Sequence, residues 1–370
     1  MGKQTNNISQ KTRIVYNYII NYIKENNLIA GDQIPAEVVI AEHINVSRPT
    51  VSKAINLLIE DGLVYKKSGV GTFISNKSPQ TEKKKVIGLL FPLIGKGEIF
   101  RPITEEITKL SANNNFSLIW GGQFSNSEFN AQHMEQMAEF YIDQKVDGIL
   151  LAPIELAKES YKINERTIRK IEVANIPIVL SDADYLEYPK RSNHDLVGID
   201  NFRAGYVSAE HYLLQGAKRV DFLSNLDMAQ TIPQRIMGYK QALINYGINP
   251  DSSWVHYIND FSKESLAPII KDKAENIICA NDNVAMKFIK GLTDIGVNVP
   301  HDVRISGFDD LDFAKYLGIP LTTIAQPCAD LADVIIYTML QRIENPALPT
   351  RSIMLDFKLK VRGSSIIPQK

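Results

Sequence analysis

Apolar residues recur at the spacing of an amphipathic helix near the start of the chain. Side chains three or four positions apart share one face of a helix, and the first such series is Ile14, Tyr18, Ile19, Tyr22 and Ile23. A second series predicts another helix and consists of Val51, Ala54, Ile55, Leu58 and Ile59. Ser47 suits the N-cap of this second helix, Pro49 its first turn and Gly62 its end. A short helix around residues 37–42 is expected between the two.

A hairpin is predicted after Gly62. Apolar residues at 64–65 and 72–74 flank a turn that contains Gly69 and Gly71. Three helices followed by a hairpin are typical of a winged helix-turn-helix. The next residues, SNKSPQTEKKK from 75 to 85, lack an apolar period and indicate a linker; contact of its lysines with DNA phosphates is an alternative role. We therefore predict a head over residues 1–75, a linker over 76–85 and a body over 86–370.

In the body, short apolar runs alternate with longer segments of helical period. The runs are 86–91, 116–120, 146–152, 176–181, 196–199, 219–223, 276–280 and 303–306, and the helical segments include 128–144, 201–215, 235–246 and 283–295. This alternation predicts an α/β fold with parallel sheets, flanking helices and right-handed crossovers. Nearly 285 residues exceed one ordinary doubly wound unit, so two lobes are expected.

Composition narrows the class of protein. With 370 residues, 44% hydrophobic and 22% charged, the chain is an ordinary globular protein rather than a collagen-like or disordered one. Its apolar runs are far shorter than the ~20 residues of a membrane helix, and residues 1–24 show no secretory signal. The two cysteines, Cys279 and Cys328, have no metal-ligand spacing around them. We expect a cytoplasmic protein with no metal, no cofactor and no membrane contact.

The overall charge of −1 conceals an asymmetry. Residues 1–85 hold 12 lysines and arginines against 7 aspartates and glutamates, and the remaining residues hold 29 against 35. A basic head on an acidic body indicates that the two parts meet different partners.

The head resembles the winged-helix domain of the GntR family. The motifs that match are Gly31-Asp32, Pro35-Ala36-Glu37, Val46-Ser47-Arg48, Thr50-Val51, Asp61-Gly62-Leu63-Val64 and Gly69-Val70-Gly71-Thr72-Phe73. The resemblance implies binding to double-stranded operator DNA. Val38 and Ser52 stand where arginines are common in the family, so the base preference is expected to differ from that of other members.

The beginning of a recognition helix enters the major groove, where short polar and basic side chains reach bases and phosphates. Arg48 suits a guanine or a phosphate, whereas Lys53 suits a phosphate. Glycine amides in the wing approach a phosphate closely because no Cβ intervenes. The predicted DNA-binding residues are Ser47, Arg48, Pro49, Thr50, Ser52, Lys53, Gly69 and Gly71.

The body resembles the effector domain of the LacI/GalR family, which is akin to periplasmic sugar-binding proteins. Five motifs occur in the family's order: Ile199-Asp200-Asn201 with Ala204-Gly205, Arg235-Ile236-Met237-Gly238-Tyr239, Cys279–Ala285, Ile305–Asp310 and Thr322–Pro327. A GntR head on such a body is similar to the arabinose-repressor subfamily. The resemblance implies a two-lobed, homodimeric protein that binds a small sugar.

The ligand site is expected beyond the carboxyl ends of the parallel strands. Asp182, Asn281 and Asp309 each follow a predicted strand, so their side chains are expected at that edge. By resemblance, Arg235 donates to sugar hydroxyls, Asp309 accepts from them, and Gln326 and Thr231 add polar contacts. Phe100 and Trp120 are candidates to stack on the sugar. The alternatives are an interlobe ion pair for Arg235 and Asp309, a turn role for Asp182, and core positions for both aromatics.

No catalytic group is predicted, because the histidines lack acid–base or metal spacing and Gly95-Lys96-Gly97 lacks the pattern of a phosphate loop. We therefore expect a sugar-responsive repressor of carbohydrate-utilisation genes, with L-arabinose as the first candidate effector. One alternative is a regulator with a purine or sugar-phosphate co-repressor. Another is a sugar-binding protein or enzyme with a vestigial head.

Overall fold

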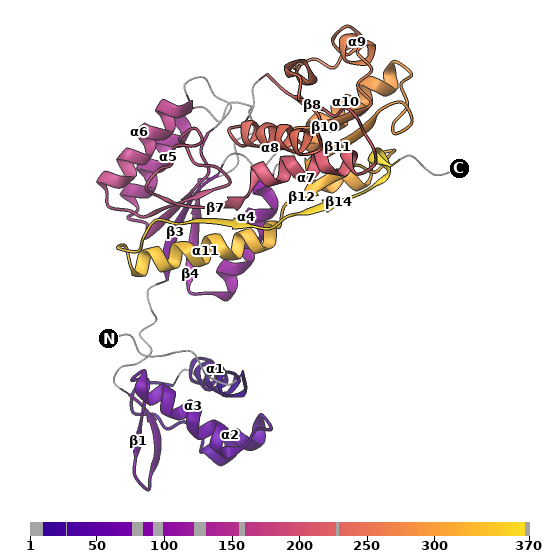
Figure 1. Ribbon diagram of the computed structural model, residues 1–370. Helices are drawn as coiled ribbons and strands as arrows, with labels where there is room; N and C mark the ends of the chain where they lie inside the picture. The colour runs from indigo at the N-terminus through magenta and orange to yellow at the C-terminus, as the bar shows by residue number, and fades with distance from the viewer. Residues whose placement is uncertain are drawn as a thin grey trace. The chain divides into compact units, whose positions relative to one another are not determined.

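The computed structural model describes residues 10–26, 28–75, 84–91, 99–121, 131–154, 160–226 and 229–366. Contacts divide the chain into two compact units, Met1–Lys84 and Lys85–Lys370 (Figure 1). Most of the predicted linker, residues 76–83, lies outside the described residues.

The first unit is a winged helix-turn-helix. Its elements are α1 (Gln10–Glu25), α2 (Glu37–His43), α3 (Arg48–Glu60), β1 (Val64–Lys67) and β2 (Gly71–Ile74). β1 and β2 pair antiparallel, and Gln33 adds an isolated bridge to Phe73. Val51, Ile55 and Leu58 from α3 are completely buried against Val15 and Ile19 of α1. Gly62 has φ +73° just beyond α3, the left-handed conformation that favours glycine after a helix.

The body begins with a six-stranded parallel sheet, here called the N-lobe sheet. Its strands run in the order β13-β7-β6-β5-β3-β4. Their bounds are β3 (Lys85–Leu90), β4 (Phe116–Trp120), β5 (Gly148–Leu151), β6 (Ile178–Ser181), β7 (Asp195–Ile199) and β13 (Ser352–Leu355). The accompanying helices are α4 (Phe100–Asn113), α5 (Ala131–Asp143), α6 (Ser160–Val173) and α11 (Cys328–Glu344).

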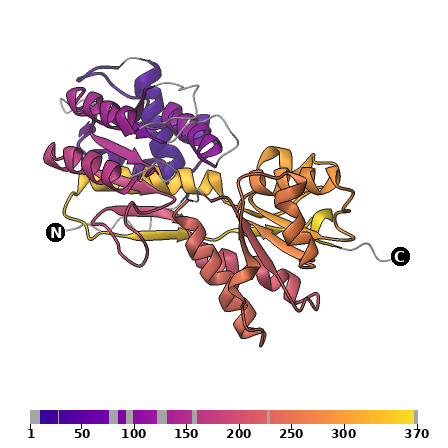
Figure 2. The ribbon, with the colours of Figure 1, turned by 90° about the horizontal axis from the view of Figure 1, so that it is seen from above.

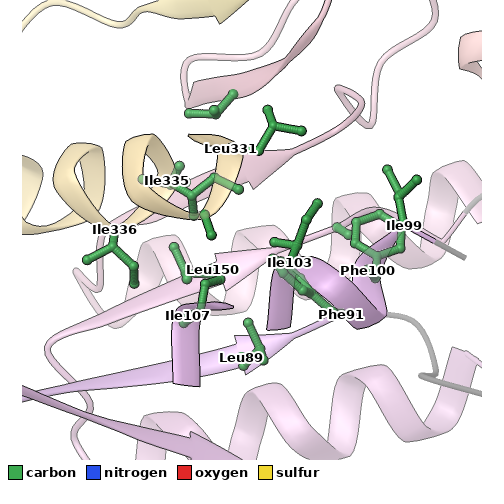
Figure 3. Close-up of a cluster of buried hydrophobic side chains, with 14 of the residues drawn as sticks. Leu89, Phe91, Ile99, Phe100, Ile103, Ile107, Leu150, Leu331, Ile335 and Ile336 are labelled. Atoms are coloured by element: carbon green, nitrogen blue, oxygen red, sulfur yellow. The ribbon is translucent and has the colours of Figure 1, made fainter. Parts of the chain in front are cut away.

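Both faces of the N-lobe sheet are covered by helices. Figure 3 shows one face, where Leu89 and Leu150 of the sheet meet Ile103 of α4 and Ile335 of α11. The opposite face packs on α5 and α6 around Tyr141 and forms a separate cluster. Strands covered on both faces are expected to be continuously apolar, which explains the run GILL in β5.

The second sheet of the body, the C-lobe sheet, has the order β14-β12-β11-β10-β8-β9. Only the β12–β14 pair is antiparallel among these neighbours. The strands are β8 (Asp221–Ser224), β9 (Val255–Tyr257), β10 (Asn276–Cys279), β11 (Arg304–Asp309), β12 (Thr322–Ala325) and β14 (Lys358–Lys360). The helices are α7 (Asn201–Leu213), α8 (Thr231–Asn245), α9 (Lys263–Lys271) and α10 (Asp282–Asp294), with short 3-10 turns η1 (Ser252–Trp254), η2 (Asp312–Lys315) and η3 (Gly363–Ser365).

The chain passes between the two sheets at three places (Figure 2). They are the connections from β7 to α7, from β12 to α11 and from β13 to β14. The predicted two-lobed α/β body with parallel sheets is therefore confirmed. Each of these connections leaves the carboxyl end of a strand, namely β7, β12 or β13.

Candidate functional site

The start of α3 presents polar and basic side chains to solvent. The Arg48 side chain is 69% exposed, Pro49 and Lys53 are exposed, and Thr50 and Ser52 are partly exposed. Ser47 is the N-cap, but its Oγ lies 2.8 Å from Oγ1 of Thr50 and does not cap a backbone amide. The accessible donors at this helix end suit contact with phosphates and base edges.

Glu37 joins the three parts of the head that carry these residues. From α2, its carboxylate lies 3.7 Å from Nε of Arg48 on α3 and 2.9 Å from Nζ of Lys66 on β1. Sequence reasoning did not identify this role, because separations of 11 and 29 residues have no local pattern. Glu37 partly neutralises the two cations and restricts where Arg48 extends.

The two wing glycines have different surroundings. Gly69 has φ +72° and a Cβ there would meet no atom within 4 Å, so its backbone is open to a ligand. Gly71 has φ +152°, and a Cβ there would lie 2.2 Å from Nε2 of Gln33. Gln33 itself donates to the carbonyl of Val70 at 3.2 Å. Gln33 is exposed and its amide can move aside, so it is the positive φ that favours glycine at 71 whether or not DNA is bound.

In the body, aspartates with unusual backbone angles end two strands. Asp182 follows β6 with φ +70°, and Asp309 ends β11 with φ +109°, followed by Asp310 with φ +54°. Such conformations cost a non-glycine residue on the order of 1–3 kcal/mol and cluster at functional sites. Both aspartates are among the predicted ligand residues.

Buried oxygen atoms without hydrogen-bond partners accompany this strain. Within the described part of the chain, Oδ1 of Asp182, Oδ1 of Asn225 and Oε1 of Gln326 have no partner. These residues follow β6, β8 and β12, which belong to both sheets. Buried acceptors are normally satisfied, so this set suits the hydroxyl donors of a ligand. Asn225 was not predicted, since a lone asparagine after a strand is common in turns.

Arg235 on α8 is 5% exposed and is held from several sides. Its Nε donates to Oδ1 of Asn201 at 2.9 Å, and its Nη1 donates to the carbonyl of Ala280 at 2.7 Å. The guanidinium carbon lies 3.4 Å from the centroid of the Phe308 ring. Stacking and bonding of this kind fix the plane of the guanidinium group.

Arg235 lies within electrostatic reach of the strand-end aspartates. Burial raises the pKa of Asp182, and the positive charge of Arg235 opposes that rise. Burial, followed by the charges of Asp309 and Asp182, raises the pKa of Cys328 at the start of α11 to about 12. Asp182 and Asp309, which come from different lobes, both act on this thiol, while Arg235 acts on Asp182 and stacks on Phe308 beside Asp309. That the three form one ligand site stays a prediction.

The remaining predicted residues have more varied positions. Gln326 donates from Nε2 to Oδ1 of Asp309 at 2.9 Å, whereas Oδ1 of Asn281 caps α10 by accepting from the amide of Val284 at 2.9 Å. Thr231 is 2% exposed at the start of α8. Ligand contact by these residues stays a prediction.

The two aromatic candidates have different surroundings. Phe100 is 8% exposed in the apolar core, with its ring 5.2 Å from that of Phe91 (Figure 3). Trp120 is 42% exposed at the end of edge strand β4, three strands or about 14 Å from β6. Their stacking on a sugar is untested and stays a prediction.

The described residues contain neither a candidate metal centre nor a candidate membrane-spanning helix. No group of three or more histidine, cysteine, aspartate or glutamate side chains there is arranged to hold a metal ion. No helix in the same residues is long and apolar enough to cross a membrane.

Known protein families match both the head and the body of the chain. Residues 11–74 match the bacterial regulatory proteins of the gntR family, and residues 209–365 match the periplasmic binding protein-like domain. The chain therefore combines a GntR-type helix-turn-helix head with a periplasmic-binding-protein-like body of the LacI type. The resemblance drawn from the sequence motifs is confirmed.

Its homologues are transcriptional repressors. The chain is 28% identical to an arabinose metabolism transcriptional repressor of Halalkalibacterium halodurans, over 95% of this chain and 96% of that protein. It is 25% identical to the transcriptional repressor PurR of Photobacterium profundum, over 88% and 97% of the two chains. A LacI family regulator of Enterococcus faecium with bound ribose matches in structure with a TM-score of 0.61 and 26% identity, over 76% and 98%.

Proposed function

We propose that this protein is a sequence-specific DNA-binding repressor whose operator affinity is controlled by a small neutral sugar. The observation that carries the proposal is the cluster of Asp182, Arg235 and Asp309 at the strand ends, with buried acceptors left open. Carboxylate and amide oxygens accept from sugar hydroxyls, and a fixed guanidinium group donates to two of them.

Charge favours a neutral effector over a phosphorylated one. Arg362 is matched by Asp310, with Nη2 2.6 Å from Oδ1. Arg362 is thus not available to a phosphate. The other cation, Arg235, lies among the acidic residues Asp182 and Asp309, which also disfavours a phosphate. The arabinose repressors among the relatives and the ribose-bound regulator point to a pentose, and L-arabinose is the first candidate. A purine co-repressor is the second candidate.

The mechanism that follows is a shift between two arrangements of the lobes. A homodimer would set two heads at a fixed distance on a palindromic operator. An effector that bridges Asp182 of one lobe and Arg235 of the other favours one arrangement, and the three connections between the sheets transmit the change. Operator affinity can change by no more than the effector's preference for one arrangement.

A thermal-shift screen of pentoses, hexoses, their phosphates and purines tests the effector. A compound that binds only the native protein raises its melting temperature. We expect a shift with a neutral pentose that is lost in Asp309→Ala and kept in Asp312→Ala, whose carboxylate is on the adjoining turn and fully exposed. A rise in melting temperature with purines alone would indicate that the effector is a purine and not a sugar.

DNA binding is tested separately. Promoter DNA from beside the gene should bind with an affinity that falls steeply with salt, and deletion of residues 1–75 should abolish binding. In the full chain, added sugar should weaken binding to the promoter DNA. Equal operator affinity with and without a bound sugar would contradict the control mechanism. Sugar binding with no affinity for promoter DNA would favour a sugar-binding protein with a vestigial head.

A further inference from the structure

A buried carboxyl group lies directly behind the strained aspartates. Asp282 is the first residue of α10 and is completely buried. Its Oδ1 accepts from the hydroxyl of Thr323 at 2.7 Å, and its Oδ2 accepts from the amide of Leu311 at 2.8 Å. Asp282 therefore connects the start of α10 with β12 and with the turn that follows β11.

That turn is the one that carries Asp309. After Asp309, the amide of Asp310 donates to Oγ1 of Thr323 at 3.3 Å, and the Asp310 carboxylate binds Arg362. The turn is thus held at Asp310 by Thr323 and Arg362 and at Leu311 by Asp282. Backbone angles that a non-glycine residue rarely adopts persist only where the surroundings determine them.

Gly307 on β11 makes room for this arrangement. A Cβ at that position would lie 2.2 Å from Oδ1 of Asp282. The carboxyl group thus packs closely against the β11 backbone, in space that a side chain at 307 would occupy. From this position it bonds Thr323 on β12 and the amide of Leu311 in the turn.

The groups facing Asp282 are mostly acidic. The Asp309 and Asp310 carboxylates face it from the turn and the Cys279 thiol from the end of β10, while Arg362 neutralises Asp310. Burial, and next the charge of Asp309, raise the pKa of Asp282 to about 8, although the bonds from Thr323 and Leu311 oppose the rise. With its pKa raised to about 8, the carboxyl group is mainly protonated at pH 7, and its Oδ1 then donates to the Thr323 hydroxyl instead of accepting from it.

We propose that Asp282 is a positioning residue that holds the turn of residues 309–311 and so sets the Asp309 carboxylate against the effector. This inference rests on the proposed function for the identity of the effector. An ionised Asp282 would repel Asp309. Effector binding expels water and strengthens that repulsion. Affinity is therefore expected to depend on Asp282 remaining neutral.

Calorimetric titration of the full chain with L-arabinose and with D-ribose from pH 6 to pH 10 tests this proposal. In the wild type, the Kd should rise above about pH 8 by up to about tenfold per pH unit, the limit for one linked proton. Asp282→Asn keeps a neutral group that accepts from Leu311 and donates to the Thr323 hydroxyl. It should bind with a Kd within about threefold of the wild type at pH 7 and lose the rise above pH 8.

Two further variants distinguish positioning from general stability. Thr323→Val removes a bond that favours the ionised carboxyl, so the midpoint of the Kd rise should move to higher pH. Asp312→Asn, the matched control on the exposed side of the same segment, should follow the wild-type profile. A wild-type profile in Asp282→Asn, or an unmoved midpoint in Thr323→Val, would overturn the proposal.

If neither pentose binds, the proposed effector class fails, but the role of Asp282 is still testable in the free protein. Carbon-13 NMR of the aspartate carboxyl groups should show one resonance that titrates near pH 8 and is absent in Asp282→Asn. The amide signals of Asp310 and Leu311 should follow the same midpoint. Titration of Asp282 in the ordinary range of aspartate, or amide signals that ignore it, would overturn the proposal independently.

Discussion

Arg235 donates a hydrogen bond from Nε to Oδ1 of Asn201 at 2.9 Å, and both side chains are at least 95% buried. Asn201 is the first residue of α7 and follows directly on the connection from the N-lobe sheet. The orientation of Arg235 in the effector site is therefore coupled to a segment that joins the two lobes.

Replacing Asn201 by alanine should weaken effector binding. The change leaves the buried Nε of Arg235 without its acceptor and frees the guanidinium plane, at a cost of about 1–3 kcal/mol. If part of this cost appears in binding, the Kd for the effector rises about tenfold, measured by calorimetry. Asn245→Ala, at the exposed end of α8, is the matched control and should bind as the wild type does.

The helices that carry these two residues cross in backbone contact. A Cβ on Gly238 of α8 would lie 1.8 Å from the carbonyl oxygen of Phe202, and one on Gly205 of α7 would lie 1.9 Å from that of Arg235. Any larger side chain at either position must separate the helices, because the obstructing atoms belong to the backbone.

Gly238→Ala should therefore destabilise the body and lower its melting temperature. Overpacking typically costs about 1–3 kcal/mol, and here the displaced helix also carries Arg235, so effector affinity should fall as well. Circular dichroism melting measures the first effect and calorimetry the second. Gly318→Ala is the control, because a Cβ there would meet nothing within 4 Å, and its melting temperature should equal that of the wild type. Equal melting temperatures for Gly238→Ala and Gly318→Ala would contradict the backbone contact.

The titration of Asp282 should be visible in the pH dependence of the free energy of unfolding, even when no effector is bound. The folded protein holds its proton to about pH 8, whereas the unfolded chain releases it near the ordinary value of 3.8. Between these values the folded state binds more protons, so this group makes the protein less stable as pH rises from about 4 to 8. Denaturant unfolding of Asp282→Asn should lack that decline. A decline equal to that of the wild type would mean that other groups cause it.

Much of the architecture could be predicted because it follows from local patterns. Buried parallel strands such as Gly148–Leu151 are continuous apolar runs, and the order of strand and helix in the body determines which strand ends meet. The same rule predicted that Asp182 and Asp309 would lie at the ligand edge. Strands β9, β13 and β14 were not predicted, and they are short edge strands with mixed exposure. The inner strand β12 was not predicted either, since its sequence TTIA contains two threonines and was matched only as part of a family motif.

The support of the site could not be predicted, since it depends on contacts between distant segments. Asp282 meets Thr323 across 41 residues, and Arg235 meets Asn201 across 34. Asp282 also looks like an ordinary acidic residue in the first turn of a helix, where a carboxylate is usual. Only its burial beside Gly307 distinguishes it from a solvent-facing one. Similarly, the core position of Phe100 depends on the tertiary fold. The N-cap role of Asn281, by contrast, is local, because its Oδ1 accepts from the amide three residues on.

The head permits a comparison of two cations on one helix. Arg48, whose Nε faces Glu37, extends from the first turn of α3, whereas Lys53 is exposed farther along it. A guanidinium group reads guanine through two hydrogen bonds, and an ammonium group acts on phosphate as a point charge. The two substitutions should therefore weaken DNA binding in different ways.

Arg48→Ala should cost about 1–3 kcal/mol on an operator selected from random DNA and should relax specificity at one position. Lys53→Ala should weaken binding to all sequences alike and lower the slope of log K against log salt by about one per head. Fluorescence anisotropy at several salt concentrations measures both effects. Lys290→Ala, which removes an exposed lysine of the body, is the control and should change neither. If Arg48→Ala lost affinity equally on operator and random DNA, Arg48 would be a phosphate contact, and base recognition would belong to Thr50 and Ser52.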